Sequence, residues 1–118
     1  VAHRTSPTNI GFLIISTVIA GRMAYISQGE VIFWQFQNYN PPDALFIGNH
    51  FANVSGYSLE PTPFNSSFAG YKDWFLQQYQ RPGYTIEAGI GQNPLPITQF
   101  NEIYNDNIGI LITGAIVN

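Results

Sequence analysis

The stretch "YTIEAGIGQNPLP", residues 84–96, decides the fold, because it joins a short extended run to a segment rich in glycine and proline. Its aromatic and β-branched residues predict a strand, and the segment that follows predicts an irregular loop. One carboxylate, Glu87, lies inside the strand between Ile86 and Ala88. A glutamate in an apolar strand costs free energy unless it is paired, protonated or open to a cleft. Glu87 is therefore the first candidate for a functional residue.

Helical patterns lie on both sides of this strand. The preceding segment, "FAGYKDWFLQQYQRPG", has aromatic residues three and four positions apart before Pro82 and Gly83, which predicts a helix. These aromatic residues are Phe68, Tyr71, Phe75 and Tyr79. After the loop, Thr98 can cap a helix with a single apolar stripe. The stripe consists of Phe100, Ile103, Tyr104, Ile108, Leu111 and Ala115.

The first half of the chain alternates in the same way. Ser6 and Pro7 predict the start of a helix that runs to about Gly21. "RMAYISQGEVIFWQF", residues 22–36, predicts two strands separated at Gly29.

A further helix is predicted from Asp43 to Gly56, with Ala44, Ile47 and Phe51 at helical spacing and Val54 on the same face. "EPTPFNSS" after it predicts an irregular loop. Strands that alternate with helices predict one layered α/β domain over residues 1–118.

The composition excludes several classes of function. Only 9% of the residues are charged, and the four basic residues are scattered, so the chain has no basic track for a nucleic acid. The chain has no cysteine, so it has neither disulfides nor a thiolate metal site. The apolar run "IGFLIISTVIAG" is too short to span a bilayer and is interpreted as a buried element. Localisation is left open.

Two interpretations of Glu87 remain open from the residues alone. The carboxylate is either a structural group paired with Arg22, Arg81 or backbone amides, or a general acid/base whose pKa is tuned by partial burial.

Three blocks in a fixed order add a resemblance. "RMAYISQGEVIFW", "FAGYKDWFLQQYQRPGYTIEAGIGQNPLP" and "ITQFNEIYNDNIGIL" resemble the C-terminal part of the zinc carboxypeptidases. The similarity is greatest to the bacterial branch that cleaves γ-D-glutamyl-diamino acid bonds in peptidoglycan peptides. The resemblance implies the C-terminal half of that catalytic domain, with part of its mixed sheet and packing helices. It also implies that Glu87, between Thr85 and Gly89, corresponds to the glutamate that moves a proton from zinc-bound water to the leaving amine.

The zinc ligands implied by the resemblance do not have counterparts in this sequence. The family uses a His-x-x-Glu pair, but neither His3 nor His50 is followed by a glutamate at the third position. Where the family has its third ligand, a histidine, this chain has Ile26. Zinc is therefore expected in intact family members and no cofactor is expected in this chain.

Three hypotheses follow, of which the third is a structural fragment with no retained binding function. The first is a peptidase-like chain that retains Glu87 but does not hydrolyse peptides alone. The second is a non-catalytic module that binds peptides or associates with itself, with Tyr25, Trp34 and Tyr84 as candidates for lining an old substrate cleft. The strands near Tyr25 and Ile86 are expected to leave an open sheet edge, which predicts a homodimer, strand exchange or pairing with a missing N-terminal half.

Overall fold

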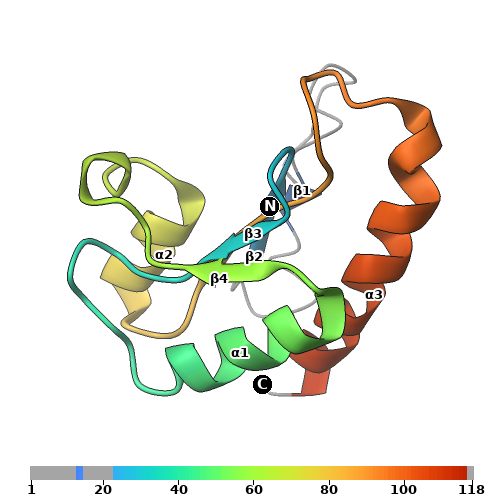
Figure 1. The fold of residues 1–118 in the computed structure, drawn as a ribbon. Helices are drawn as coiled ribbons and strands as arrows, with labels where there is room; N and C mark the ends of the chain where they lie inside the picture. Colours follow the sequence, from blue (N-terminus) through green and yellow to red (C-terminus); the bar gives the residue numbers. More distant parts are fainter. Residues whose placement is uncertain (1–12, 15–22, 117–118) are drawn as a thin grey trace.

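The computed structural model describes residues 13–14 and 23–116. They form a five-stranded sheet in the order β1-β2-β5-β3-β4, with three α-helices (Figure 1). The strands are β1 Leu13–Ile14, β2 Met23–Ile26, β3 Val31–Phe33, β4 Ser58–Glu60 and β5 Tyr84–Glu87. The helices are α1 Ala44–Ser55, α2 Tyr71–Tyr79 and α3 Phe100–Ile116, with short 3₁₀ turns at Phe64–Ser66 and Ile97–Gln99. The prediction of a mixed α/β sheet with packing helices is confirmed. Within these residues, no helix has the length and apolar character needed to cross a membrane.

The central strand is β5, which lies between β2 and β3, two strands that follow each other in the sequence. β5 runs parallel to β2 and antiparallel to β3, while β3 pairs in parallel with β4. The predicted strands on either side of Gly29 are therefore correct, but they are not neighbours, because β5 lies between them. β2 and β5 are also flanked on both edges, so the open edge expected near Tyr25 and Ile86 is absent from the described sheet.

One face of the sheet carries the main core. Successive side chains of a strand alternate between faces, and the register places the side chains of Met23, Tyr25, Ile32, Tyr84 and Ile86 on the same face. They form one buried cluster with residues of α1 and with Ile110 of α3, and α1 and α3 pack together (Figure 1). The buried apolar residues of α2, Phe75 and Leu76, lie outside this cluster, and α2 contacts β2 and β5. Helix α2 therefore covers the second face.

Helix α1 follows its prediction closely. Ala44, Ile47 and Phe51 are buried, and Gly56 ends the helix in a left-handed conformation at φ 78°. Only Val54 departs from the pattern, since its side chain is 44% exposed. Gly109 of α3 packs against it: a Cβ at Gly109 would lie 2.9 Å from the Cβ of Val54. This small residue lets α3 approach α1 closely.

Three other predictions are corrected. Leu13–Ile14 is a strand paired with β2, so the predicted helix is wrong there, and its other residues lie outside the described part of the chain. The strand β4 was not predicted, and α2 begins at Tyr71 rather than at Phe68.

The apolar stripe of α3 is also only partly right. Ile103 and Leu111 pack against the core, but the buried residues of the helix are Asn107, Ile110 and Gly114. Asn107 is buried because its amide donates to the Tyr57 hydroxyl at 2.9 Å and to the Ile103 carbonyl at 2.8 Å. These hydrogen bonds offset the cost of burying a polar group, which an apolar stripe cannot anticipate.

Candidate functional site

Glu87 lies at the carboxyl end of β5, opposite Ile26 of β2 and Val31 of β3. Its side chain lies on the sheet face that points away from the main core and is half-buried. Its carboxylate reaches over the turn at Gly29: a Cβ at Gly29 would lie 2.9 Å from Glu87 Oε2. Gly29 also has a φ of 140°, which side-chain-bearing residues rarely adopt. Glycine at this position thus makes room for the carboxylate.

The surroundings of the carboxylate are held by hydrogen bonds between two loops. The Gly29 N–H donates to the Gly89 carbonyl at 2.7 Å, and Ser27 Oγ donates to Asn93 Oδ1 at 2.7 Å. The side-chain amide of Gln99 accepts a hydrogen bond from the Ile90 N–H and donates one to the Ile90 carbonyl. The turn before β3 and the segment after β5 are therefore fixed to each other around Glu87.

The electrostatic state of Glu87 fits an acid/base group. Loss of solvation on partial burial raises the pKa of this carboxyl above the ordinary glutamate range. Among the residues that the structure describes, the single ion pair joins Lys72 and Asp73, so Arg81 does not pair with Glu87. Arg22, the other predicted partner, lies outside the described residues. An accessible carboxyl with a raised pKa can exchange a proton at a pH closer to neutrality.

Replacing Glu87 by glutamine should stabilise the fold slightly at neutral pH. Because the folded-state pKa is raised, the stabilising contribution of this group is present below the ordinary glutamate pKa and is lost as the pH rises through the raised value. We expect Glu87→Gln to increase the free energy of unfolding by less than about 1 kcal/mol at pH 7 and to have no effect in acid, measured by urea unfolding. Glu60→Gln, at an exposed acid on β4, is the matched control. A loss of stability in Glu87→Gln at pH 7 would mean that the carboxylate is paired.

The described residues near Glu87 supply no group of three candidate metal ligands. Ile26, paired in register with Glu87, has no donor atom for a metal. His50 is exposed on α1, and its ring packs edge-on against Phe46 at 4.8 Å. His3 lies outside the described residues. Within residues 13–14 and 23–116, no group of three candidate metal ligands includes Glu87.

A separate cluster of carboxylates lies between the turn before β3 and α3. Ligand atoms of Glu30, Glu102 and Asp106 lie within 4.8 Å of one another. Burial raises the pKa of Glu30 first, and the negative charges of Asp106 and Glu102 raise it further. The sequence shows Glu102 and Asp106 one helical turn apart, but nothing in it indicates that Glu30 joins them, because that contact depends on how α3 packs.

The three aromatic residues predicted to line a cleft are core residues in the structure. Tyr84 is 0% exposed and donates its hydroxyl to the Ala44 carbonyl at 2.7 Å, while Tyr25 and Trp34 are each 8% exposed. Tyr25 and Tyr84 belong to the sheet face opposite Glu87. Burial raises the pKa of the Tyr25 hydroxyl, and the nearby Tyr57 raises it further. The large apolar area of Tyr25, Trp34 and Tyr84 explains why these side chains are buried.

Trp34 borders a surface hollow of about 490 Å³. Asn40, Pro41, Asp43, Leu45, Phe46 and Asn49 form the rest of its lining. Trp34 follows the end of β3, which is antiparallel to β5, so the hollow lies beyond the Tyr84 end of β5. Glu87 lies at the other end of that strand.

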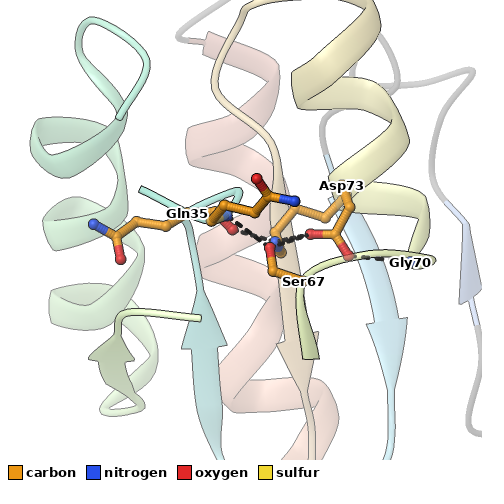
Figure 2. A network of polar contacts seen from close by, with 6 residues as sticks. Gln35, Ser67, Gly70 and Asp73 are labelled. Atoms are coloured by element: carbon orange, nitrogen blue, oxygen red, sulfur yellow. Dashed lines mark hydrogen bonds and ion pairs between the residues drawn. The ribbon is translucent and has the colours of Figure 1, made fainter. Parts of the chain in front are cut away.

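A buried polar network fixes the start of α2 (Figure 2). Lys72 Nζ pairs with Asp73 Oδ1 at 2.5 Å and donates to the Gln35 carbonyl, and both charged side chains are buried. Asp73 also accepts from Ser67 Oγ at 3.2 Å and from the Gly70 N–H at 3.1 Å. Burial lowers the pKa of Lys72, while Asp73 acts in the opposite direction. The network was not predicted, because a Lys-Asp dipeptide is usually a solvated surface pair.

The chain folds as a mixed α/β sheet whose central strand ends in a carboxyl group that forms no ion pair with a described residue. The chain is 48% identical, over 92 residues, to γ-D-glutamyl-L-diamino acid endopeptidase 1 of Lysinibacillus sphaericus, which makes that protein a homologue. It is 40% identical, over 89 residues, to the uncharacterized protein YqgT of Bacillus subtilis (strain 168).

These matches cover 78% and 75% of this chain but 23% and 24% of the two relatives. The chain thus spans about a quarter of the length of each. A stretch of 92 residues within a chain of 118 necessarily includes residues 27–92, so Glu87 lies inside the matched region. No protein-family model matches the chain.

Proposed function

We propose that the chain corresponds to the C-terminal, Glu87-bearing portion of a hydrolase related to the zinc carboxypeptidases that cleave γ-D-glutamyl-diamino acid bonds, and that it does not hydrolyse peptides alone. The observation that carries the proposal is Glu87 itself: a half-buried carboxyl with a raised pKa, at the end of the central strand and inside the matched region. The activity stated in the name of the endopeptidase homologue supplies the substrate class.

Glu87 would act by moving one proton. Its carboxylate would accept a proton from a water molecule as the water oxygen attacks the amide carbon. The same proton would pass to the amine nitrogen as the carbon–nitrogen bond breaks. The hydrogen-bonded loops around Gly29 and Gly89 would hold the carboxylate in place for both transfers.

A carboxylate without further help is too weak a catalyst for this reaction. General acid–base catalysis contributes about 10²–10⁴-fold, whereas enzymes typically accelerate reactions by about 10⁶–10¹⁷-fold. The described residues beside Glu87 contain no set of metal ligands, because the paired position is Ile26. This chain alone therefore lacks the groups that would supply most of the rate acceleration.

The first test is zinc content together with peptide cleavage. We expect the purified chain, dialysed against a modest zinc excess, to retain substoichiometric zinc by elemental analysis and to leave a γ-D-glutamyl-diamino acid peptide intact. Glu87→Gln and Ile26→His are the paired variants, and both should behave like the parent chain. Zinc that is lost in Glu102→Gln but kept in Glu87→Gln would be held by the acidic cluster instead. Stoichiometric, chelator-sensitive zinc with cleavage that Glu87→Gln abolishes would overturn the proposal.

A further inference from the structure

One side chain from the turn before α3 is hydrogen-bonded to both backbone groups of a residue that follows Glu87 closely in the sequence. The side-chain amide of Gln99 accepts from the Ile90 N–H at 3.0 Å and donates to the Ile90 carbonyl at 2.7 Å. Gln99 belongs to the 3₁₀ turn Ile97–Gln99, at the end of the loop that leads from β5 to α3 (Figure 1). Gln99 is half-buried, whereas the two residues before it are exposed. It is therefore the residue of this turn that contacts the segment after β5.

The peptide group that Gln99 holds is also held from its other side. The Gly89 carbonyl and the Ile90 N–H belong to one planar trans peptide group and point in opposite directions. The N–H donates to Gln99, and the carbonyl oxygen accepts from the Gly29 N–H at 2.7 Å. Because the group is planar, fixing its N–H also fixes the direction of its carbonyl. Gln99 therefore determines where the Gly29 N–H finds its acceptor.

The Gly29 turn lies directly beside the carboxylate of Glu87. A Cβ at Gly29 would lie 2.9 Å from Glu87 Oε2 and 3.7 Å from Glu87 Cβ. The Ala88 N–H donates to the Ile26 carbonyl at 2.8 Å, which holds the backbone after Glu87 against the end of β2. The contacts thus run without a break from Gln99, through one peptide group and the Gly29 turn, to the Glu87 side chain.

We propose that Gln99 is a positioning residue, which holds the Gly29 turn against Glu87 and so fixes the direction and the solvation of its carboxylate. The inference rests on the proposed function, because a group that transfers a proton must be kept within hydrogen-bond reach of the donor and of the acceptor. Glutamine suits this role, since its amide supplies both a donor and an acceptor. The amide is also uncharged, so it orients the carboxylate without adding a Coulombic effect of its own.

Gly89 leaves the space that Gln99 needs in order to approach the peptide group. A Cβ at Gly89 would lie 3.0 Å from Gln99 Oε1, 2.9 Å from Ile103 Cδ1 and 2.5 Å from Leu95 Cδ1. Ile103 lies one helical turn after Gln99 and packs against the main core. The amide therefore reaches the peptide group from an element that is itself anchored in the fold, as a positioning group requires.

The second side-chain contact between the two loops is less suited to this role. Ser27 Oγ donates to Asn93 Oδ1 at 2.7 Å, but Asn93 is exposed. Neither side chain bonds to the peptide group that accepts from Gly29. Water competes for an exposed hydrogen bond of this kind, so its net contribution is small. Gln99, with two hydrogen bonds to one residue, is the stronger link.

The first test is amide hydrogen exchange of three variants. Gln99→Met removes both hydrogen bonds at a similar side-chain length, and Gln99→Asn keeps the amide but is one methylene shorter, so it cannot hold both Ile90 groups. Gln92→Met, at an exposed glutamine of the same loop, is the matched control. We expect the Gly29 amide to exchange about tenfold faster in both Gln99 variants, because its acceptor is no longer fixed. The amides of β3 and β5 should keep their parental protection, as should all amides in Gln92→Met.

NMR titration of the Glu87 side-chain carboxyl carbon is the second measurement. Loss of solvation raises the pKa of Glu87, so a turn that is no longer held should admit water and lower this pKa towards the ordinary glutamate range. We expect this downward shift in Gln99→Met and Gln99→Asn, and no shift in Gln92→Met. A residue that only stabilised the fold would lower protection throughout the sheet and leave the Glu87 titration unchanged.

Three results would overturn the proposal. The first is parental exchange at Gly29 in both Gln99 variants, and the second is faster exchange with an unchanged titration of Glu87. The third is an equal effect in Gln92→Met, which would mean that any change in the loop is felt at the carboxylate. These measurements use the chain without zinc or peptide, so their outcome is separate from that of the cleavage test, which concerns the proposed function alone.

Discussion

Replacing Asp73 by alanine is expected to lower the free energy of unfolding by about 3–5 kcal/mol. The substitution leaves the buried ammonium of Lys72 without its counter-charge and removes the acceptor of the Ser67 hydroxyl and the Gly70 N–H. Breaking a buried ion pair by removing one partner costs this much because the other charge stays buried. Since small domains are stable by only about 5–15 kcal/mol, Asp73→Ala should bring the fold close to its limit. Urea unfolding measures the change.

A double variant separates the buried charge from the rest of the network. Lys72→Met/Asp73→Ala removes both charges, so we expect it to be more stable than Asp73→Ala alone. Glu60→Ala, at an exposed acid, should change the free energy of unfolding by less than about 0.5 kcal/mol. If Asp73→Ala costs no more than Glu60→Ala, the pair is solvated in solution and does not anchor α2.

The second large effect is expected at Gly89, the residue two positions after Glu87. A Cβ there would lie 2.5 Å from Leu95 Cδ1, 2.9 Å from Ile103 Cδ1 and 3.0 Å from Gln99 Oε1. Gly89 also has a φ of 81°, which costs other residues about 1–2 kcal/mol. Crowding adds about 1 kcal/mol, the lower end of the cost of overpacking, because all three atoms are the ends of flexible side chains. We therefore expect Gly89→Ala to lower the free energy of unfolding by about 2–3 kcal/mol in urea unfolding.

Gly56 provides a control with the same backbone conformation and no crowding. Its φ is 78°, and a Cβ there would meet no atom within 4 Å. Gly56→Ala should thus cost only the backbone contribution of about 1–2 kcal/mol. Equal losses at Gly89 and Gly56 would show that the loop after β5 shifts to accept a methyl group.

The sequence predicts those features that depend on neighbouring residues. The strands around Gly29, the strand that contains Glu87 and the helix that ends at Gly56 each have local signals of turn chemistry or spacing. β4 escapes prediction because "SLE" is short and ends in a charge, so only its parallel pairing with β3 defines it as a strand.

Features that depend on tertiary packing could not be predicted. The apolar residues of α3 cover so much of its surface that the pattern does not specify which part is buried. Asn107 faces the core because Tyr57 lies there to receive its amide. In the same way, aromatic character alone does not distinguish a cleft from a core, and the register places Tyr25 and Tyr84 inside. The sequence places Glu87 in an apolar strand, but its partial burial depends on packing, because neighbouring residues of a strand point to opposite faces.

The position of β5 between β2 and β3 determines the order in which the chain can fold. The Gly29 turn cannot close a local hairpin, because each of its strands pairs with residues more than fifty positions away. Closing such long loops costs conformational entropy, and this cost is offset only after the central strands have paired. On a ribosome, the sheet therefore has no central strand until residue 87 has emerged, and until then β2 and β3 can pair only with the short edge strands β1 and β4.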